Sequence, residues 1–143
     1  QLMDYVNSGK TKIVFKDFHF LGEDSITAAV FGRAFFERYP DRFHEWFVAM
    51  MNAQDGEGDS GFGNLASIQA LTAQMPGVDV ASVVALMNEK KAAYEAAVEA
   101  DYREGVSLGI NGTPTVIVGK KLLSGRSPAQ FVAEIKAGLD AQL

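Results

Sequence analysis

Hydrophobic residues recur every three or four positions through the middle of this chain, the spacing that places them on one face of an α-helix. The clearest run is Leu65, Ile68, Leu71 and Met75, which predicts a helix that Pro76 and Gly77 end. Other segments share the pattern. Further helices are predicted to begin at a cap on Asp24 or Ser25, at Pro40 and at a cap on Asp79, with a long one over about residues 89–108.

β-Branched and aromatic residues gather instead toward the two ends of the chain, which is typical of strands. Residues 13–18 form one such run and residues 115–118 a second. A third run, residues 121–124, follows across Gly119 and Lys120, a two-residue connection suited to a hairpin. Strands near both ends with helices between them predict an α/β fold, in which a small mixed sheet carries an inserted helical domain.

Both ends of the chain also carry helix signals. Leu2, Tyr5 and Val6 have helical spacing, so residues 1–7 are predicted to be the end of a helix. Near the other end, Ser127 is a predicted N-cap, with Pro128 at the first helical position and Gln130 completing a capping box. The residues that this last helix is predicted to bury are Phe131, Ile135 and Leu139.

Composition narrows the classes of function. The 143 residues are 48% hydrophobic and 22% charged, which suits a globular domain with one core. The net charge of −5 provides no basic surface for nucleic acid, and no apolar run approaches the roughly 20 residues that span a bilayer. The absence of cysteine excludes disulfides, thiolate metal sites and thiol catalysis by these residues.

The most informative segment is residues 109–119, where Gly112, Thr113 and Pro114 lead directly into the β-branched run. Proline has no N–H to donate and a fixed φ, so it suits the entry of a strand and not its interior. Glycine just before it permits a tight turn. The segment predicts a constrained loop that presents backbone groups at the edge of a sheet, with a cis peptide bond between Thr113 and Pro114.

This loop resembles the cis-proline loop of the thioredoxin superfamily, specifically its DsbA-like branch, and other segments match that branch in order. Residues 12–18 resemble its second core strand, and residues 121–125 with Ser127 and Pro128 resemble its last strand and helix start. The segments that resemble parts of the inserted helical domain and its return are 21–25 with 28–29, 42–47, 76–79, Asp101 and 108–109.

The resemblance implies a thioredoxin-like portion in residues 1–23 and 109–143, with a helical insert over residues 24–108. It implies a thiol:disulfide oxidoreductase or isomerase without a bound cofactor or metal, located in the periplasm or otherwise outside the cytoplasm. Its partners would be an extended peptide or protein substrate, bound at Gly112, Thr113 and Pro114, and a redox partner protein. Phe20 and the neighbouring His19 would lie at the rim of the active site.

The family's first strand and its Cys-x-x-Cys segment have no counterpart in these residues. The order of elements argues against residues 20–23 as a degenerate active site, because no strand follows before residue 53. We therefore expect the first strand and the cysteine pair to lie before Gln1. In the family's sheet that strand lies between the strands that correspond to residues 13–18 and 115–118. Its place is filled by a segment before Gln1, or by a strand from another chain, or the sheet closes differently. The first alternative is favoured.

Two other functions stay open. The chain could be a non-catalytic thioredoxin-fold module that binds peptides, encoded without cysteine. It could also belong to the glutathione-transferase-like or isomerase relatives, which use a hydroxyl nucleophile in place of the thiol. The gene sequence upstream of Gln1 distinguishes these possibilities.

The remaining candidate residues favour structural interpretations. His19 and His44 lack the convergent partners that a catalytic triad or a zinc site needs, so they are interpreted as packing or surface residues. Residues 55–59 begin like a calcium loop, but the pattern fails at Ser60 and Ala66. Lys16 and Asp17 are predicted to form a surface or rim ion pair.

Overall fold

A computed structural model describes residues 2–54, 62–123 and 127–142. The chain divides into two compact units, which we call the helical unit, residues 16–105, and the terminal unit, residues 1–15 with 106–143. Each unit is described by itself. The domain boundaries implied by the resemblance, after residues 23 and 108, stay a prediction.

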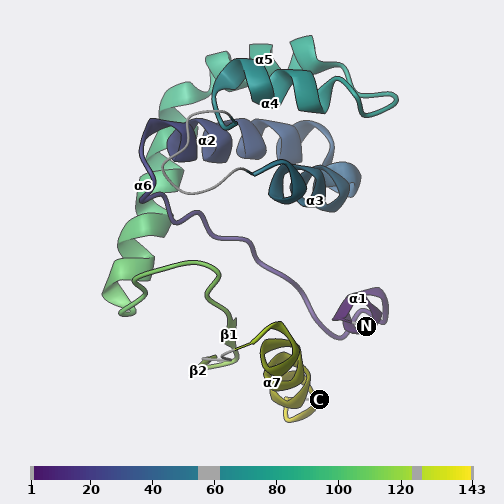
Figure 1. Ribbon diagram of the computed structural model, residues 1–143, viewed down its shortest axis with the longest axis vertical. Coiled ribbons are helices and arrows are strands. Elements are labelled where there is room, and N and C mark those ends of the chain that lie inside the picture. Colours follow the sequence, from purple (N-terminus) through teal and green to yellow (C-terminus); the bar gives the residue numbers. More distant parts are fainter. Residues whose placement is uncertain (1, 55–61, 124–126, 143) are drawn as a thin grey trace. The chain divides into compact units, whose positions relative to one another are not determined.

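The helical unit is built around α2, which contacts α3, α4 and α5 (Figure 1). The predicted helices all form. The unit comprises α2 (Glu23–Arg38), the 3₁₀ turn η1 (Pro40–Arg42), α3 (Phe43–Ala53), α4 (Leu65–Thr72), α5 (Val80–Glu89) and α6 (Lys91–Ser107), whose last two residues pass into the terminal unit.

Two caps test the sequence reasoning. Asp79 caps α5 as predicted, because its side chain accepts a hydrogen bond from the Ser82 N–H. The predicted cap of α2 by Asp24 or Ser25 is wrong, since Gly22 is the N-cap and offers no side chain. Glu23 and Asp24 lie in the first turn instead, where their negative charges favour the positive end of the helix dipole.

Aromatic side chains form the centre of the helical core. Phe31 and Phe35 on α2 are fully buried, and both rings stack on Trp46 of α3, with centroids 5.8 and 5.1 Å away. Gly32 allows this close approach, because a Cβ there would lie 3.1 Å from Trp46 Cζ3. The buried residues of this core are Val30, Phe31, Ala34, Phe35, Trp46, Met50, Ile68, Met75, Val83, Met87, Tyr94 and Val98.

The polar atoms buried in this core are satisfied. The Trp46 indole donates to the Thr72 hydroxyl at 3.0 Å, and that hydroxyl donates to the Ile68 carbonyl at 2.7 Å. The Tyr94 hydroxyl of α6 donates to the carboxylate of Glu37 at 2.8 Å. Burial, together with this hydrogen bond, raises the pKa of Tyr94 to about 12, so the hydroxyl keeps its proton at neutral pH.

The terminal unit contains a short antiparallel hairpin, β1 (Ile117–Val118) and β2 (Lys121–Leu122). Ile117 pairs with Leu122 and Val118 with Lys121, across the predicted turn at Gly119 and Lys120. Gly119 has φ +61°, and the favoured two-residue hairpin turns need such a positive φ at their first position. Both strands are shorter than the predicted 115–118 and 121–124, and Ser124 lies outside the described residues.

Helix α7 (Pro128–Asp140) packs on β1. Ser127 caps it as predicted, because its hydroxyl accepts from the Gln130 N–H at 3.3 Å. A Cβ at Gly138 would lie 3.1 Å from Val118 Cγ1, so the helix and strand are in close contact there. The predicted burial of Phe131, Ile135 and Leu139 is wrong: all three are half-buried, since strands this short cover little of the helix.

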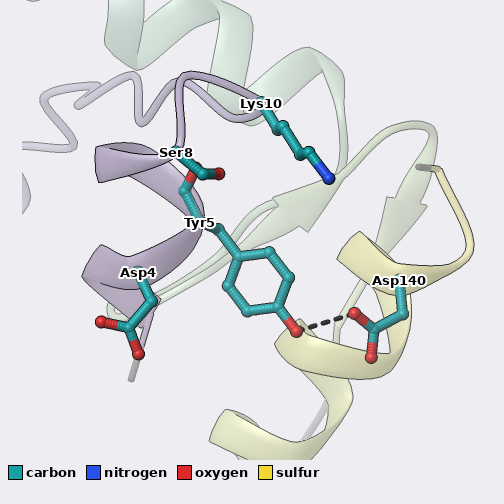
Figure 2. Close-up of a pocket in the computed structure, with 5 residues that line it drawn as sticks. All are labelled: Asp4, Tyr5, Ser8, Lys10 and Asp140. Atoms are coloured by element: carbon teal, nitrogen blue, oxygen red, sulfur yellow. Dashed lines mark hydrogen bonds between the residues drawn. The ribbon is translucent and has the colours of Figure 1, made fainter.

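Helix α1 (Leu2–Asn7) confirms the predicted N-terminal helix over the residues that the structure describes. Its Tyr5 hydroxyl donates to Asp140 Oδ1 of α7 at 2.7 Å, and this hydrogen bond raises the pKa of Tyr5 (Figure 2). An open depression of about 340 Å³ surrounds the pair. Its lining residues are Asp4, Tyr5, Ser8, Lys10 and Asp140.

The strand predicted over residues 13–18 is wrong. In the structure this segment has no regular secondary structure, and the side chains of Ile13, Val14 and Phe15 are 47%, 59% and 45% exposed. A strand exists only where a neighbour supplies ladder hydrogen bonds, and in the described parts of the chain no strand pairs with this segment. The β-branched composition alone therefore did not determine its conformation.

Candidate functional site

The loop before the hairpin lies in the terminal unit, and its Thr113–Pro114 peptide bond is cis. The Thr115 hydroxyl donates to the Gly112 carbonyl at 2.7 Å, which closes the turn around the proline. After the turn, the Leu123 N–H donates to the Val116 carbonyl at 2.9 Å. The chain therefore pairs with the residue that follows β2 just two positions beyond the proline.

Thr113 is an exposed residue of this loop. Its side chain and that of Pro114 are exposed, and a Cβ at Gly112 would meet no atom within 4 Å. Across the described residues, neither the N–H nor the carbonyl of Thr113 has a hydrogen-bond partner. An exposed donor and acceptor on one residue are what an incoming extended chain needs in order to pair by its own backbone.

His19 and Phe20, the residues predicted at the rim, lie in the helical unit. The His19 ring is half-buried against Tyr102, with centroids 4.7 Å apart, and its Nε2 is 3.4 Å from Glu99 Oε2. Phe20 is 45% exposed. Because the loop and the rim residues belong to different units, their placement in one site stays a prediction. His44 is exposed on α3, as expected of a surface histidine.

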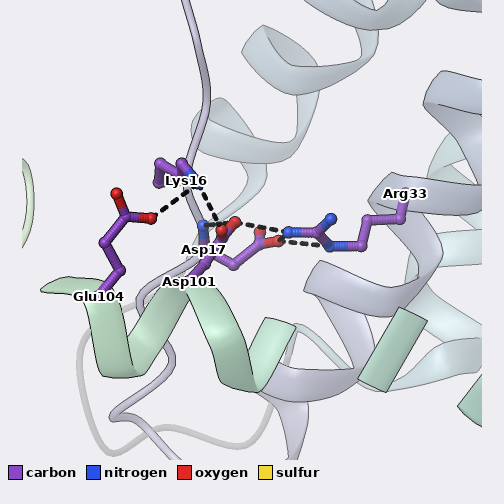
Figure 3. A network of polar contacts seen from close by, with 5 residues as sticks. All are labelled: Lys16, Asp17, Arg33, Asp101 and Glu104. Carbon is purple, nitrogen blue, oxygen red and sulfur yellow. Dashed lines mark hydrogen bonds and ion pairs between the residues drawn. The ribbon is translucent and has the colours of Figure 1, made fainter. Parts of the chain in front are cut away.

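A network of charged side chains lies in the helical unit (Figure 3). Its centre is Asp101 of α6, which is 9% exposed. Asp101 Oδ1 accepts from Lys16 Nζ at 2.8 Å, and Oδ2 accepts from Arg33 Nη2 at 2.6 Å and from the Asp17 N–H at 3.2 Å. Lys16 also contacts Glu104 at 2.9 Å, and Arg33 Nε donates to Asp17 at 2.8 Å.

The pKa values of the two aspartates in this network are shifted in opposite directions. Burial raises the pKa of Asp17 and outweighs the nearby Arg33 guanidinium, which by itself would lower it. Burial also opposes ionisation of Asp101, but the hydrogen bonds from Lys16 and the Asp17 N–H, with the charge of Arg33, outweigh it and lower the pKa of Asp101. Asp101 is therefore the firmly ionised hub.

Lys16 and Asp17 both form ion pairs, but with other residues than predicted: Lys16 pairs with Asp101 and Glu104, and Asp17 pairs with Arg33. Arg33 and Asp101 are 68 positions apart in sequence, and no local pattern relates them. The only available signal was the presence of Asp101 among the segments that resemble the family.

Metal binding gains no support from the described residues, where no group of three or more His, Asp or Glu side chains is placed to hold an ion. The calcium-like segment 55–59 lies outside the described residues. In the same described part of the chain, no helix is both long and apolar enough to cross a membrane.

The described residues place a helical unit between a short N-terminal segment and a proline-entered hairpin followed by a helix, which is the order of elements that the resemblance implies. The family model described as thioredoxin matches residues 1–137, and the chain belongs to that family. This confirms the predicted superfamily and fold class, and the mostly helical chain with a small sheet is consistent with the DsbA-like branch.

Among solved structures, the chain is similar to oxidised BdbD from Bacillus subtilis. The two share 20% sequence identity at a TM-score of 0.76, over 96% of this chain and 74% of that one. At this identity the similarity concerns the fold. No curated protein matches the sequence.

Proposed function

We propose that this chain docks an extended polypeptide on the loop formed by Gly112, Thr113 and Pro114, as the substrate-binding part of a DsbA-like thiol:disulfide oxidoreductase or isomerase. The observation that carries the proposal is that Thr113 is exposed and that neither its N–H nor its carbonyl has a hydrogen-bond partner among the described residues. Pairing through main-chain atoms gives affinity with little demand on the substrate's sequence, which suits an enzyme with many protein substrates.

The thiol chemistry itself cannot come from these residues, because the sequence contains no cysteine. In the proposed reaction a thiolate from outside these residues attacks a substrate disulfide. The substrate S–S bond breaks, one substrate sulfur joins the mixed disulfide and the other leaves as a thiolate, while the loop holds the substrate backbone. The resemblance to the DsbA-like branch adds a protein substrate, a redox partner protein and a location outside the cytoplasm to the same proposal.

The absence of cysteine also favours a second function, a peptide-binding module that performs no redox chemistry. Both functions use the same loop. They differ in whether a thiol from outside these 143 residues acts next to it. A protein that binds peptides at the loop but never forms a mixed disulfide in its full-length form would support the second function.

The docking test exploits the lack of cysteine, since a single introduced cysteine is the only thiol available for labelling. Gly112→Cys places the label in open space beside Thr113, and Asn88→Cys, on the exposed surface of α5, is the matched control. We expect a bulky maleimide adduct at position 112, but not at position 88, to weaken binding of a cysteine-free extended peptide about tenfold or more. Equal binding by both adducts would contradict docking at the loop.

A second experiment addresses the chemistry separately. The purified 143-residue chain is expected to reduce insulin, or to oxidise a dithiol peptide, no faster than buffer, because it has no nucleophilic thiol. Exchange above background would overturn the assignment of the chain as a docking part.

A further inference from the structure

The charged network centred on Asp101 lies where the chain passes between its two units. The unit boundaries fall between residues 15 and 16 and between residues 105 and 106. Lys16 is thus the first residue of the helical unit, and Glu104 is next to its last. We call the two points at which the chain passes between the units its crossings. Lys16 Nζ donates to both Glu104 and Asp101, at 2.9 and 2.8 Å, so one ammonium group links residues next to both crossings.

The two crossings differ in stiffness. The crossing at residues 105 and 106 is inside α6, where helical hydrogen bonds hold the backbone. The crossing at residues 15 and 16 has no regular structure and no ladder hydrogen bonds. A segment of this kind keeps one position only where side chains or capping groups hold it.

The network supplies such contacts from two sides. Arg33 of α2 reaches both Asp17 and Asp101, and the Asp17 N–H donates to Asp101 at 3.2 Å. The segment is therefore held through a side chain and its own backbone at successive residues. Apolar contacts follow at once, because Phe18 and His19 both pack on Tyr102, with centroids 5.0 and 4.7 Å away.

We propose that Lys16, Asp17, Arg33, Asp101 and Glu104 form an electrostatic clamp that fastens the irregular crossing to α6, with Asp101 as its hub. The clamp keeps the two crossings together. It also holds in place residues 16 and 17, from which the chain leads to His19 and Phe20. This inference does not depend on peptide docking, since every contact that carries it lies within the helical unit.

Hydrogen exchange of backbone amides tests the clamp in the full chain. In Asp101→Asn we expect the amide of Asp17, which donates to Asp101 at 3.2 Å, to exchange about tenfold or more faster, because three charge-assisted contacts weaken together. Amides of α5, such as that of Val83, should change by less than about twofold. Faster exchange at the Asp17 amide without acceleration in α5 supports the clamp, whereas unchanged exchange at Asp17, or equal acceleration in α5, overturns it.

Lys16→Met provides a second variant if Asp101→Asn does not fold. The Lys16 side chain is 53% exposed and contacts Asp101 and Glu104, so its loss should leave the core intact and still speed exchange of the Asp17 amide about threefold or more. Lys16→Arg, which keeps the charge and the reach, should restore protection. Failure of Lys16→Arg to protect the segment better than Lys16→Met would overturn the role of the charge.

Discussion

Replacing Thr72 by valine tests the account of the helical core most sharply. Valine keeps the shape of threonine but removes the hydroxyl that accepts the indole N–H of Trp46 at 3.0 Å. Both residues are buried, with Trp46 3% and Thr72 0% exposed, so water cannot replace the lost acceptor. The indole would then be buried without a hydrogen bond, a state that native proteins avoid.

The magnitude follows from two opposing contributions. Leaving a buried donor unsatisfied costs about 1–3 kcal/mol. Burying the additional methyl of valine returns about 0.8 kcal/mol. The expected net loss is about 0.2–2.2 kcal/mol, which at a urea m-value of about 1.5 kcal/mol/M lowers the unfolding midpoint by about 0.1–1.5 M.

The assay uses a natural reporter, because Trp46 is the chain's one tryptophan and its fluorescence reports the surroundings of the altered bond. A double-mutant cycle isolates that bond. In a Trp46→Phe background, followed by circular dichroism, no indole remains to be orphaned, so Thr72→Val should cost about 1 kcal/mol less than in the native chain. Equal costs in the two backgrounds would refute the assigned hydrogen bond.

Three further predictions concern the cap of α7 and the charged network. Ser127→Ala should destabilise α7 by about 0.5–1 kcal/mol in thermal unfolding, while Ser127→Asp should not, because only alanine removes the cap of the Gln130 N–H. For pH, Asp101 has a lowered pKa, so the advantage of the native chain over Asp101→Asn should persist at neutral pH and vanish as pH falls below the ordinary value of 3.8. Asp17 has a raised pKa, so relative to Asp17→Asn the native chain should gain stability as pH falls from 7 toward 3.8; urea midpoints across pH check both signs.

Sequence reasoning succeeded where the determining interactions are local. The helices of the inserted unit follow from apolar spacing, and the caps at Asp79 and Ser127 follow from residues that lie three positions from their partners. The hairpin turn at Gly119 was likewise predictable, because a two-residue connection needs a residue that tolerates positive φ.

Sequence reasoning failed where the structure depends on contacts between residues that are far apart in the sequence. Residues 13–18 have a strand-like composition, but strand formation depends on a neighbour that the segment itself does not contain. Similarly, Arg33 and Asp101 are joined only by the fold. The burial of α7 was overestimated because an apolar face predicts that a helix packs, and not how much surface its neighbour covers.

The central claim is that the backbone of Thr113 pairs with the backbone of an extended substrate. Two versions of one bound peptide test it, N-methylated at alternate residues so that each lacks the N–H groups of one edge. We predict that one version binds about tenfold or more weakly than the unmodified peptide and that the other binds about as well, because only one edge faces the loop. Equal affinities for the two versions, whether unchanged or reduced, would contradict strand pairing at this loop.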